Sequence, residues 1–147
     1  MTPHVTDAPS DADRQAVLTG LLAFNRETLT DSGPPRPLAV LWRDAAGAAL
    51  GGAIGHSWCG WVFIELLHLP AALRGQRIGT ELMRLVEAEA RARHCIGIHL
   101  DTFSFQARGF YEKLGFTVFG TLDGMPPGHA RYWLAKRLTE ETPHVPA

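Results

Sequence analysis

Apolar residues along the chain recur with two different spacings, and together these predict a mixed order of helices and strands. Alternation of apolar and polar positions, bounded by glycine and proline, is typical of half-buried strands. Apolar residues three and four positions apart, as at Ile78, Leu82, Leu85 and Val86, indicate an amphipathic helix. The predicted elements are a helix capped by Asp11 or Asp13, strands over 38–42, 48–55 and 61–69, a helix from about 77, a strand over 98–102, a helix over 107–114, and strands over 116–119 and 131–138.

This order predicts an α/β fold, with a mixed central sheet of about six to seven strands and helices on both faces. The two connections that contain helices are expected to be right-handed crossovers between parallel neighbouring strands. In the second strand Gly51, Gly52 and Gly55 weaken the pairing and indicate a bulge. We expect a single domain over residues 1–147, with its core at about 11–138 and a polar tail after it.

Composition and charge narrow the class of protein. The 147 residues are 46% hydrophobic and 20% charged, as in an ordinary soluble domain. The 14 basic and 15 acidic residues leave a net charge of −1, which gives no bulk attraction to nucleic acid or to an anionic membrane. No signal-peptide pattern opens the chain, no apolar stretch approaches the roughly 20 residues of a membrane span, and Cys59 and Cys95 stand in no metal-ligand motif. We therefore expect a cytoplasmic protein without a metal site, whose partners are small molecules or other proteins.

The segment most suggestive of chemistry is the strand, turn and helix start over residues 67–80. The first amides of a helix have no internal partner and lie at the positive end of its dipole, so this arrangement suits a phosphate or pyrophosphate. Gly75 and Gly79 let a ligand approach the backbone, and Arg74 and Arg77 add positive charge. The residues alone leave two interpretations open, an anion site or an ordinary helix start with solvated arginines.

Two motifs resemble those of the GNAT N-acetyltransferase superfamily. Residues 74–79 (RGQRIG) are similar to its acetyl-CoA pyrophosphate loop, usually Gln or Arg, two residues, Gly, one residue, then Gly or Ala. Arg77 stands at the position of the first glycine, where we expect it to hold a helical conformation. Residues 110–116 (FYEKLGF) resemble the signature that follows the family's fifth strand. The likeness covers roughly residues 38–138, resembles small bacterial members of the family, and implies the GNAT fold with acetyl-CoA as co-substrate.

The resemblance implies a set of contacts with the cofactor. The backbone of Leu67 and Leu69 would pair with the pantetheine arm like an added strand, because the two parallel strands splay apart at that level in the family. Amides from Gly75 to Thr80 would bind the pyrophosphate, and Ser104 and Gln106 would contact the cofactor arm. The expected cofactor-binding residues are Leu67, His68, Leu69, Arg74, Gly75, Gln76, Arg77, Ile78, Gly79, Thr80, Ser104 and Gln106.

The resemblance also implies direct attack of a neutral amine on the acetyl thioester in a ternary complex. Such a reaction needs a route for the ammonium proton, a donor for the oxyanion and an acid for the leaving thiolate. Tyr111 matches the tyrosine that relatives place near the thioester sulfur, and the backbone N–H of Leu69 is the candidate oxyanion donor. Glu65 is the candidate base, because it shares a strand face with Leu67 and Leu69 and its apolar neighbours would desolvate it. Structural roles stay open for both side chains, Tyr111 packed on the short helix and Glu65 paired with an arginine.

We therefore expect an acyltransferase that moves the acetyl group of acetyl-CoA to a primary amine. The acceptor stays open between a small amine, an antibiotic-like molecule and a protein lysine or N-terminus. The alternative is a non-catalytic domain of the same fold that binds or senses acyl-CoA. Arg77 and Ser104 point to this alternative, while Tyr111 argues against it. A homodimer through edge pairing of the last strand, residues 131–138, is a further expectation.

Overall fold

The first of two compact units in the chain contains one helix. The computed structural model describes residues 1–139, and the chain divides into Met1–Gly33 and Pro34–Ala147. Helix α1 (Asp11–Asn25) begins at Ser10, whose hydroxyl accepts a hydrogen bond from the Asp13 N–H at 3.1 Å, while the Asp13 carboxylate accepts one from the Ser10 N–H at 2.9 Å. Hydrogen bonds from Ser10 lower the pKa of Asp13. The predicted cap at Asp11 or Asp13 is wrong, because Ser10 opens this capping box and Asp13 completes it.

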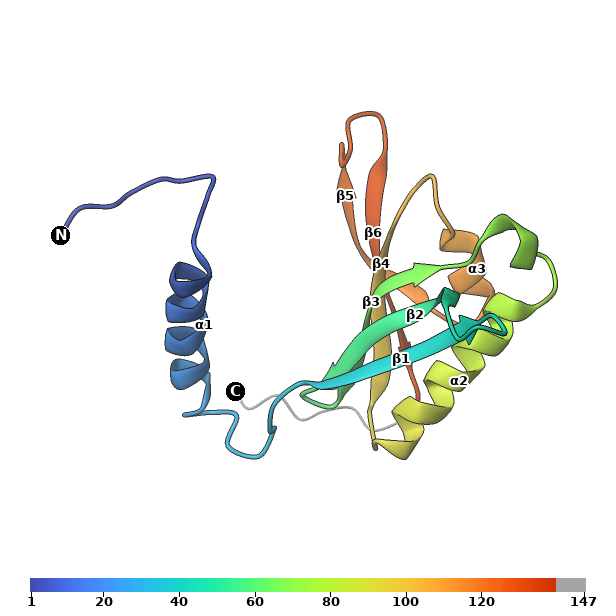
Figure 1. The fold of residues 1–147 in the computed structure, drawn as a ribbon, viewed down its shortest axis with the longest axis horizontal. Helices are drawn as coiled ribbons and strands as arrows, with labels where there is room; N and C mark the ends of the chain where they lie inside the picture. Colours follow the sequence, from blue (N-terminus) through green and yellow to red (C-terminus); the bar gives the residue numbers. More distant parts are fainter. Residues whose placement is uncertain (140–147) are drawn as a thin grey trace. The chain divides into compact units, whose positions relative to one another are not determined.

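The second unit is a six-stranded mixed sheet flanked by two helices (Figure 1). Its elements are β1 (Arg36–Arg43), β2 (Ala49–Trp58), β3 (Trp61–His68), the short 3-10 helix η1 (Ala71–Leu73), α2 (Ile78–Ala92), β4 (Gly97–Phe103), α3 (Arg108–Lys113), β5 (Thr117–Asp123) and β6 (Ala130–Arg137). The strands lie in the order β1-β2-β3-β4-β6-β5, and every neighbouring pair is antiparallel except β3 and β4. This architecture confirms the predicted α/β class.

The position of β6 corrects two expectations. β6 lies between β4 and β5, so the edges of the sheet that the structure describes are β1 and β5. Leu134 in β6 is fully buried, as suits an interior strand. The predicted dimer contact through an exposed last strand is therefore wrong. The connection through α3 also joins strands that are not neighbours, whereas the connection through α2 joins the parallel neighbours β3 and β4 as predicted.

The hydrophobic core lies between the sheet and the apolar side of α2. Leu82 and Val86 of α2 are fully buried, as are Val62 of β3 and Leu134. Burial of each such side chain contributes about 1.5–3 kcal/mol. Tyr111 of α3 belongs to the same cluster. The core therefore fixes the start of α2 and the position of Tyr111 relative to β3 and β4.

A bulge interrupts the pairing of β2 with β3. The register shifts between Ile54 and Gly55, which leaves Glu65 as an extra residue on β3. A Cβ atom at Gly55 would lie 1.9 Å from the carbonyl oxygen of Phe63, so a larger residue cannot take this place without a backbone shift. The bulge that the glycines predicted is confirmed. Because a bulge bends its strand and re-aims side chains, it determines where Glu65 lies.

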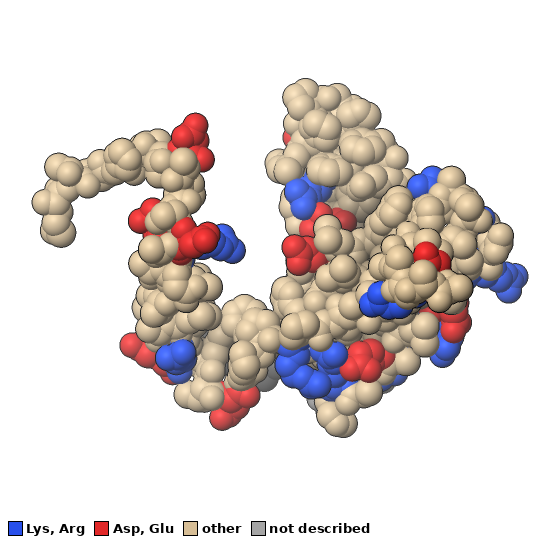
Figure 2. Space-filling view, in the orientation of Figure 1, with Lys and Arg blue, Asp and Glu red and all other residues tan. Residues whose placement is uncertain are grey.

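The surface of the described residues carries both signs of charge (Figure 2). On α2, Arg84 pairs with Glu81 and Arg93 with Glu89, at helical spacing. None of the helices in the described part of the chain has the length and apolar character that crossing a membrane requires. The predicted polar tail lies, from residue 140 onward, outside the described residues.

Candidate active site

The parallel strands β3 and β4 separate before either of them ends. Their pairing stops at Ile64 and Leu100, although β3 continues to His68 and β4 to Phe103. Past this point β3 is still paired with β2, and β4 with β6, on their other sides. Backbone groups that face the gap are therefore available to an extended ligand, in the way that a sheet edge accepts an added strand.

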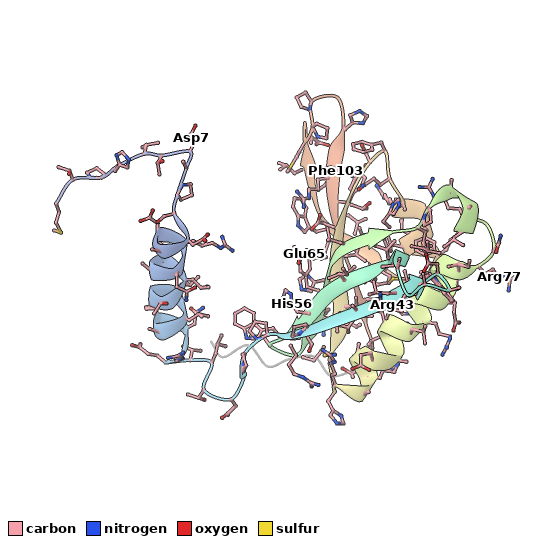
Figure 3. The ribbon with its side chains drawn as sticks, viewed as in Figure 1. Asp7, Arg43, His56, Glu65, Arg77 and Phe103 are labelled. Carbon is pink, nitrogen blue, oxygen red and sulfur yellow. The ribbon has the colours of Figure 1, made fainter. Side chains whose placement is uncertain are left out.

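A cavity of about 340 Å³ lies at the gap between the two strands. Its walls include two carboxylates and an arginine, Glu65, Asp101 and Arg131. Arg131 donates from Nε to the Asp101 carboxylate at 2.9 Å, and its guanidinium lies over the Phe103 ring at 5.2 Å from the centroid. Glu65 lies on the side of β3 away from α2 (Figure 3) and forms no ion pair within residues 1–139. Glu65 therefore carries the uncompensated charge of this cavity.

Tyr111 of α3 also lines this cavity. Only 5% of Tyr111 is exposed, and its ring packs edge-on against Phe110 and Phe116. Burial, and to a lesser extent the negative charge of Asp101, raises the pKa of Tyr111 to about 12. The phenol therefore stays protonated at neutral pH, where it can donate a hydrogen bond to a negatively charged atom in the cavity.

A groove of about 720 Å³ adjoins this cavity and extends to the start of α2. Leu67, Gln106 and Ala107 line both spaces, which places the groove and the cavity side by side. Its lining near β3 and α3 includes the apolar side chains of Leu67, Phe105 and Phe110. The end at α2 is lined by Arg74, Gly75, Arg77, Gly79 and Thr80.

The first turn of α2, beside this groove, contains amides that have no intrahelical partner. The first intrahelical bond of α2 runs from the Glu81 N–H to the Arg77 carbonyl at 3.0 Å, so the N–H groups of Ile78, Gly79 and Thr80 precede it. A Cβ atom at Gly79 would lie 3.2 Å from the ring of Phe110, so glycine lets α2 approach this side chain closely. The groove thus combines an apolar wall with a cationic end of the kind that binds phosphate.

Comparison with known proteins decides which family has this arrangement. The model of the acetyltransferase (GNAT) family matches residues 7–116, more than half of the chain. The chain belongs to the GNAT family of acetyltransferases. Members of this family transfer acyl groups from acyl-CoA, so the chain is an acyltransferase.

Individual relatives of this GNAT chain are acetyltransferases as well. The chain is 36% identical over 134 residues to acetyltransferase Atu2258 of Agrobacterium fabrum, a match that covers 91% of this chain and 95% of that protein. It is 33% identical over 119 residues to blasticidin-S acetyltransferase of Streptomyces morookaense, covering 80% and 88% respectively. A crystal structure from Agrobacterium tumefaciens, described as an acetyltransferase, has a TM-score of 0.88 and 33% identity, covering 94% of this chain and all of that one.

The structure brings most of the predicted cofactor residues of this GNAT acetyltransferase to one groove. Gln76 and Ile78 belong to the same loop and helix start but do not line it. Arg74 donates from Nε to the Leu69 carbonyl at 3.0 Å, which holds the loop against the end of β3. The predicted residues that line the groove are Leu67, His68, Leu69, Arg74, Gly75, Arg77, Gly79, Thr80 and Gln106.

The conformation of Arg77 corrects the expectation that it is helical. Its φ of 59° and ψ of 14° are left-handed, and it precedes α2 as the N-cap. This expectation is wrong because the chain turns from the loop into the helix at residue 77 through a positive φ. Glycine is the residue that adopts such a φ without strain.

Ser104 has a structural partner outside the groove. Its hydroxyl accepts a hydrogen bond from the Ala130 N–H at 3.0 Å, and its own N–H donates to the Ala130 carbonyl at 2.8 Å. These bonds tie the end of β4 to the start of β6, so the arrangement gives no support to the predicted contact of Ser104 with a cofactor. Gln106 does line the groove, and its side-chain oxygen accepts from the Phe103 N–H at 2.8 Å, which fixes its orientation.

The surroundings of Glu65 also differ from the prediction. Glu65 is exposed at the gap. The ring of Phe63, one of the apolar neighbours expected to desolvate Glu65, stacks on His99 with 4.9 Å between the ring centroids. The predicted desolvation of Glu65 is therefore wrong, because the bulge leaves this residue at an open site. The alternative was that Glu65 pairs with an arginine, but Glu65 forms no ion pair in the described part of the chain.

Sequence reasoning missed two features of the site. One is the pairing of Arg131 with Asp101, which depends on the register that places Arg131 opposite Phe103 on β4. The other is Phe110, whose ring joins that of Phe105 in the wall of the groove. Phe105 is 57% exposed and stacks on Phe103.

Proposed function

We propose that the chain is an N-acetyltransferase that transfers the acetyl group of acetyl-CoA to a primary amine in a ternary complex. The observation that carries the proposal is the gap between β3 and β4, where the cavity lined by Tyr111 adjoins the cationic groove. The groove at α2 suits the phosphates, the free edge of β3 at Leu67 suits the pantetheine arm, and the cavity suits the thioester. The family match begins at residue 7 and so extends into both compact units, which supports a single acetyltransferase domain.

The proposed reaction is a direct acyl transfer. The neutral amine nitrogen attacks the thioester carbonyl carbon, the new C–N bond forms as the C–S bond breaks, and CoA leaves as the thiolate. The N–H of Leu69 donates to the carbonyl oxygen as its negative charge develops. The amine nitrogen loses its proton to water at the open side of the gap or to the exposed carboxylate of Glu65.

Tyr111 acts in this scheme as a hydrogen-bond donor to the sulfur. Its pKa is raised to about 12, well above the value of about 8.5 for an ordinary thiol. Full proton transfer from the phenol to the thiolate is therefore uphill, whereas a hydrogen bond from the neutral phenol stabilises the developing negative charge. The proton that finally reaches CoA comes from solvent.

The acceptor proposed for the site is a small amine that carries positive charge at neutral pH. Asp101 is neutralised by Arg131, while the Glu65 carboxylate is uncompensated and attracts an ammonium group. A relative 33% identical to this chain is named for the acetylation of blasticidin S, which supports testing small antibiotics before protein lysines.

The test is a turnover assay with acetyl-CoA and a panel of amines. The panel includes blasticidin S, aminoglycosides, simple diamines and a lysine peptide, with an alcohol and a carboxylate as controls. We expect one amine class to gain a single acetyl group by mass spectrometry, with equal release of free CoA thiol. Binding of acetyl-CoA without any acetylated product would contradict the proposal and favour a non-catalytic acyl-CoA-binding domain.

A further inference from the structure

An aromatic surface lies on the face of the sheet away from α2. Val62 and Ile64 of β3 belong to the core with α2, so the alternate residues Trp61 and Phe63 lie on the opposite face. A cavity of about 380 Å³ on this face is lined by His56, Trp58, Cys59, Trp61, Phe63 and His99. Trp61 and His99 also line a second cavity, of about 660 Å³, so the two cavities adjoin.

The rings of this aromatic surface pack against one another. Phe63 stacks on His99 with 4.9 Å between centroids and 30° between the ring planes. Trp61 packs edge-on against His99 at 6.1 Å, and His56 edge-on against Phe63 at 5.7 Å. All four side chains are partly exposed. Burial, and to a lesser extent the neighbouring His56, lower the pKa of His99, so its ring is uncharged at neutral pH. The stacked pair of Phe63 and His99 therefore offers a ligand two uncharged rings in a set arrangement.

The aromatic surface is continuous with the cavity at the gap between β3 and β4. Phe63 and His99 are partners in the parallel register, and two residues further along the same strands stand Glu65 and Asp101, which line that cavity. Figure 3 shows His56 and Glu65 on the side of the sheet away from α2. Two residues of a strand span about 6–7 Å. An acceptor whose amine nitrogen lies beside Glu65 therefore has the rest of its molecule within reach of the Phe63 and His99 rings.

The charges around the aromatic surface disfavour a second cation on the acceptor. Within the described part of the chain, neither of its two cavities has an aspartate or a glutamate in its lining. Arg137 lines the larger one, and its guanidinium lies over the Trp61 ring, 5.4 Å from the centroid. This guanidinium already uses the face of that ring and repels another cation. Because the uncompensated carboxylate is Glu65, charge complementarity favours an acceptor with one ammonium group there and an uncharged body.

We propose that Phe63 and His99 determine acceptor specificity by binding a flat, uncharged ring that a short spacer joins to the acetylated amine. This inference rests on the proposed function and names the class of amine that the site accepts. A flat ring makes both stacked and edge-on contacts with aromatic side chains, whereas a puckered ring of similar size has no aromatic face to offer. Polyamines and aminoglycosides, which carry several positive charges, should be poor acceptors.

The experiment compares 2-phenylethylamine with 2-cyclohexylethylamine, which share the ammonium group and the spacer and differ in the flatness of the ring. The value of kcat/KM is measured for both amines and for spermidine with acetyl-CoA as donor, and the Kd of each amine is measured by calorimetry in the presence of CoA. We expect 2-phenylethylamine to bind and to react at least about fivefold better than 2-cyclohexylethylamine, and spermidine to react more slowly than either.

Two variants at one position test whether the ring of Phe63 causes this preference. Phe63→Leu should abolish the difference between the two ring amines by raising KM for 2-phenylethylamine, whereas Phe63→Tyr, which keeps an aromatic ring, should retain it. The melting temperature of each variant verifies folding. The Kd for acetyl-CoA should stay within about twofold of the wild-type value in both variants, because Phe63 does not line the groove at α2.

The outcomes separate this inference from the proposed function. Equal Kd and kcat/KM values for the two ring amines in the wild type would overturn the role of the aromatic surface and leave the acetyltransferase proposal intact. A preference that persists in a folded Phe63→Leu would also overturn it, because the flat ring would then be recognised elsewhere. Faster acetylation of spermidine than of 2-phenylethylamine would overturn the proposed class of acceptor. Binding of acetyl-CoA without acetylation of any amine would instead refute the proposed function.

Discussion

Arg131 on β6 donates from Nε to the carboxylate of Asp101 on β4 at 2.9 Å, in the wall of the cavity between β3 and β4. The guanidinium also lies over the rings of Phe103 and Trp133, at 5.2 and 5.5 Å from their centroids. This pair removes Asp101 as a free anion, although its charge still contributes to the raised pKa of Tyr111. Glu65, which forms no ion pair within residues 1–139, therefore remains the uncompensated carboxylate of the cavity.

Replacing Tyr111 with phenylalanine should impair chemistry more than binding. We expect Tyr111→Phe to lower kcat by tenfold or more, with the Kd for acetyl-CoA within about twofold of wild type, because in the proposed reaction the hydroxyl donates to the leaving sulfur and not to the phosphates. The matched control is Tyr132→Phe, which alters the other tyrosine, partly buried under the Arg108 guanidinium at 4.5 Å. Near-normal turnover in Tyr111→Phe would remove the phenol from the mechanism.

Tyr111 should also make the folded protein sensitive to alkali. Its pKa is raised from 10.0 to about 12, so between these values the folded state keeps a proton that the unfolded state loses. The contribution of Tyr111 to the free energy of unfolding is therefore fully present below pH 10 and falls by about 2 kcal/mol as the pH rises to 12. Urea unfolding of the wild type and Tyr111→Phe at several pH values measures this loss. Identical alkaline slopes for the two proteins would show that the phenol is not desolvated.

The charge of Glu65 should matter for the acceptor. We expect Glu65→Gln to raise KM for a cationic amine by roughly tenfold, since the uncompensated carboxylate attracts ammonium, with kcat changed less than about threefold. Glu27→Gln, an exposed site in the first unit, serves as the control. If kcat instead falls by about a hundredfold at constant KM, Glu65 is the general base and not a binding residue.

Ser104→Ala tests whether the Ser104 hydroxyl stabilises the sheet by joining the end of β4 to the start of β6. Loss of the hydrogen bond from the Ala130 N–H should lower the free energy of unfolding by about 1 kcal/mol. The Kd for acetyl-CoA should stay within about twofold, because Ser104 does not line the groove. Unfolding and calorimetry on the same preparation give both numbers. A stable variant with weakened cofactor binding would restore the role that the sequence suggested for Ser104.

Local patterns predicted much of this structure. Helical spacing at Ile78, Leu82 and Val86 predicted α2, and these positions are indeed its more buried side. The glycines of β2 predicted the bulge, because they have no side chain to obstruct the close approach at Gly55. The arginines and glycines before α2 predicted a loop open to a ligand at the start of that helix, and they do line a groove there. Each of these features depends on residues close together in the sequence.

Features that depend on distant residues were not predictable in the same way. The place of β6 inside the sheet depends on which strand pairs with β4, and neighbouring residues do not encode that choice. The exposure of Glu65 follows from a one-residue register shift opposite β2. The left-handed φ of Arg77 contradicts the ordinary preference of arginine, so residue type pointed the wrong way.

The most direct test of the central claim is calorimetric titration of acetyl-CoA into the wild type and into Ala107→Phe. Ala107 lines both the cavity and the groove, so a phenyl ring there should obstruct the path from the phosphate end to Tyr111. Ala88→Phe, at an exposed position on α2, controls for the added ring, and unliganded melting temperatures verify folding. We predict one acetyl-CoA per chain with a Kd below about 1 mM for the wild type and the control, and at least tenfold weaker binding by Ala107→Phe. Undiminished binding by a folded Ala107→Phe would contradict the account, because acetyl-CoA would then not occupy the gap between β3 and β4.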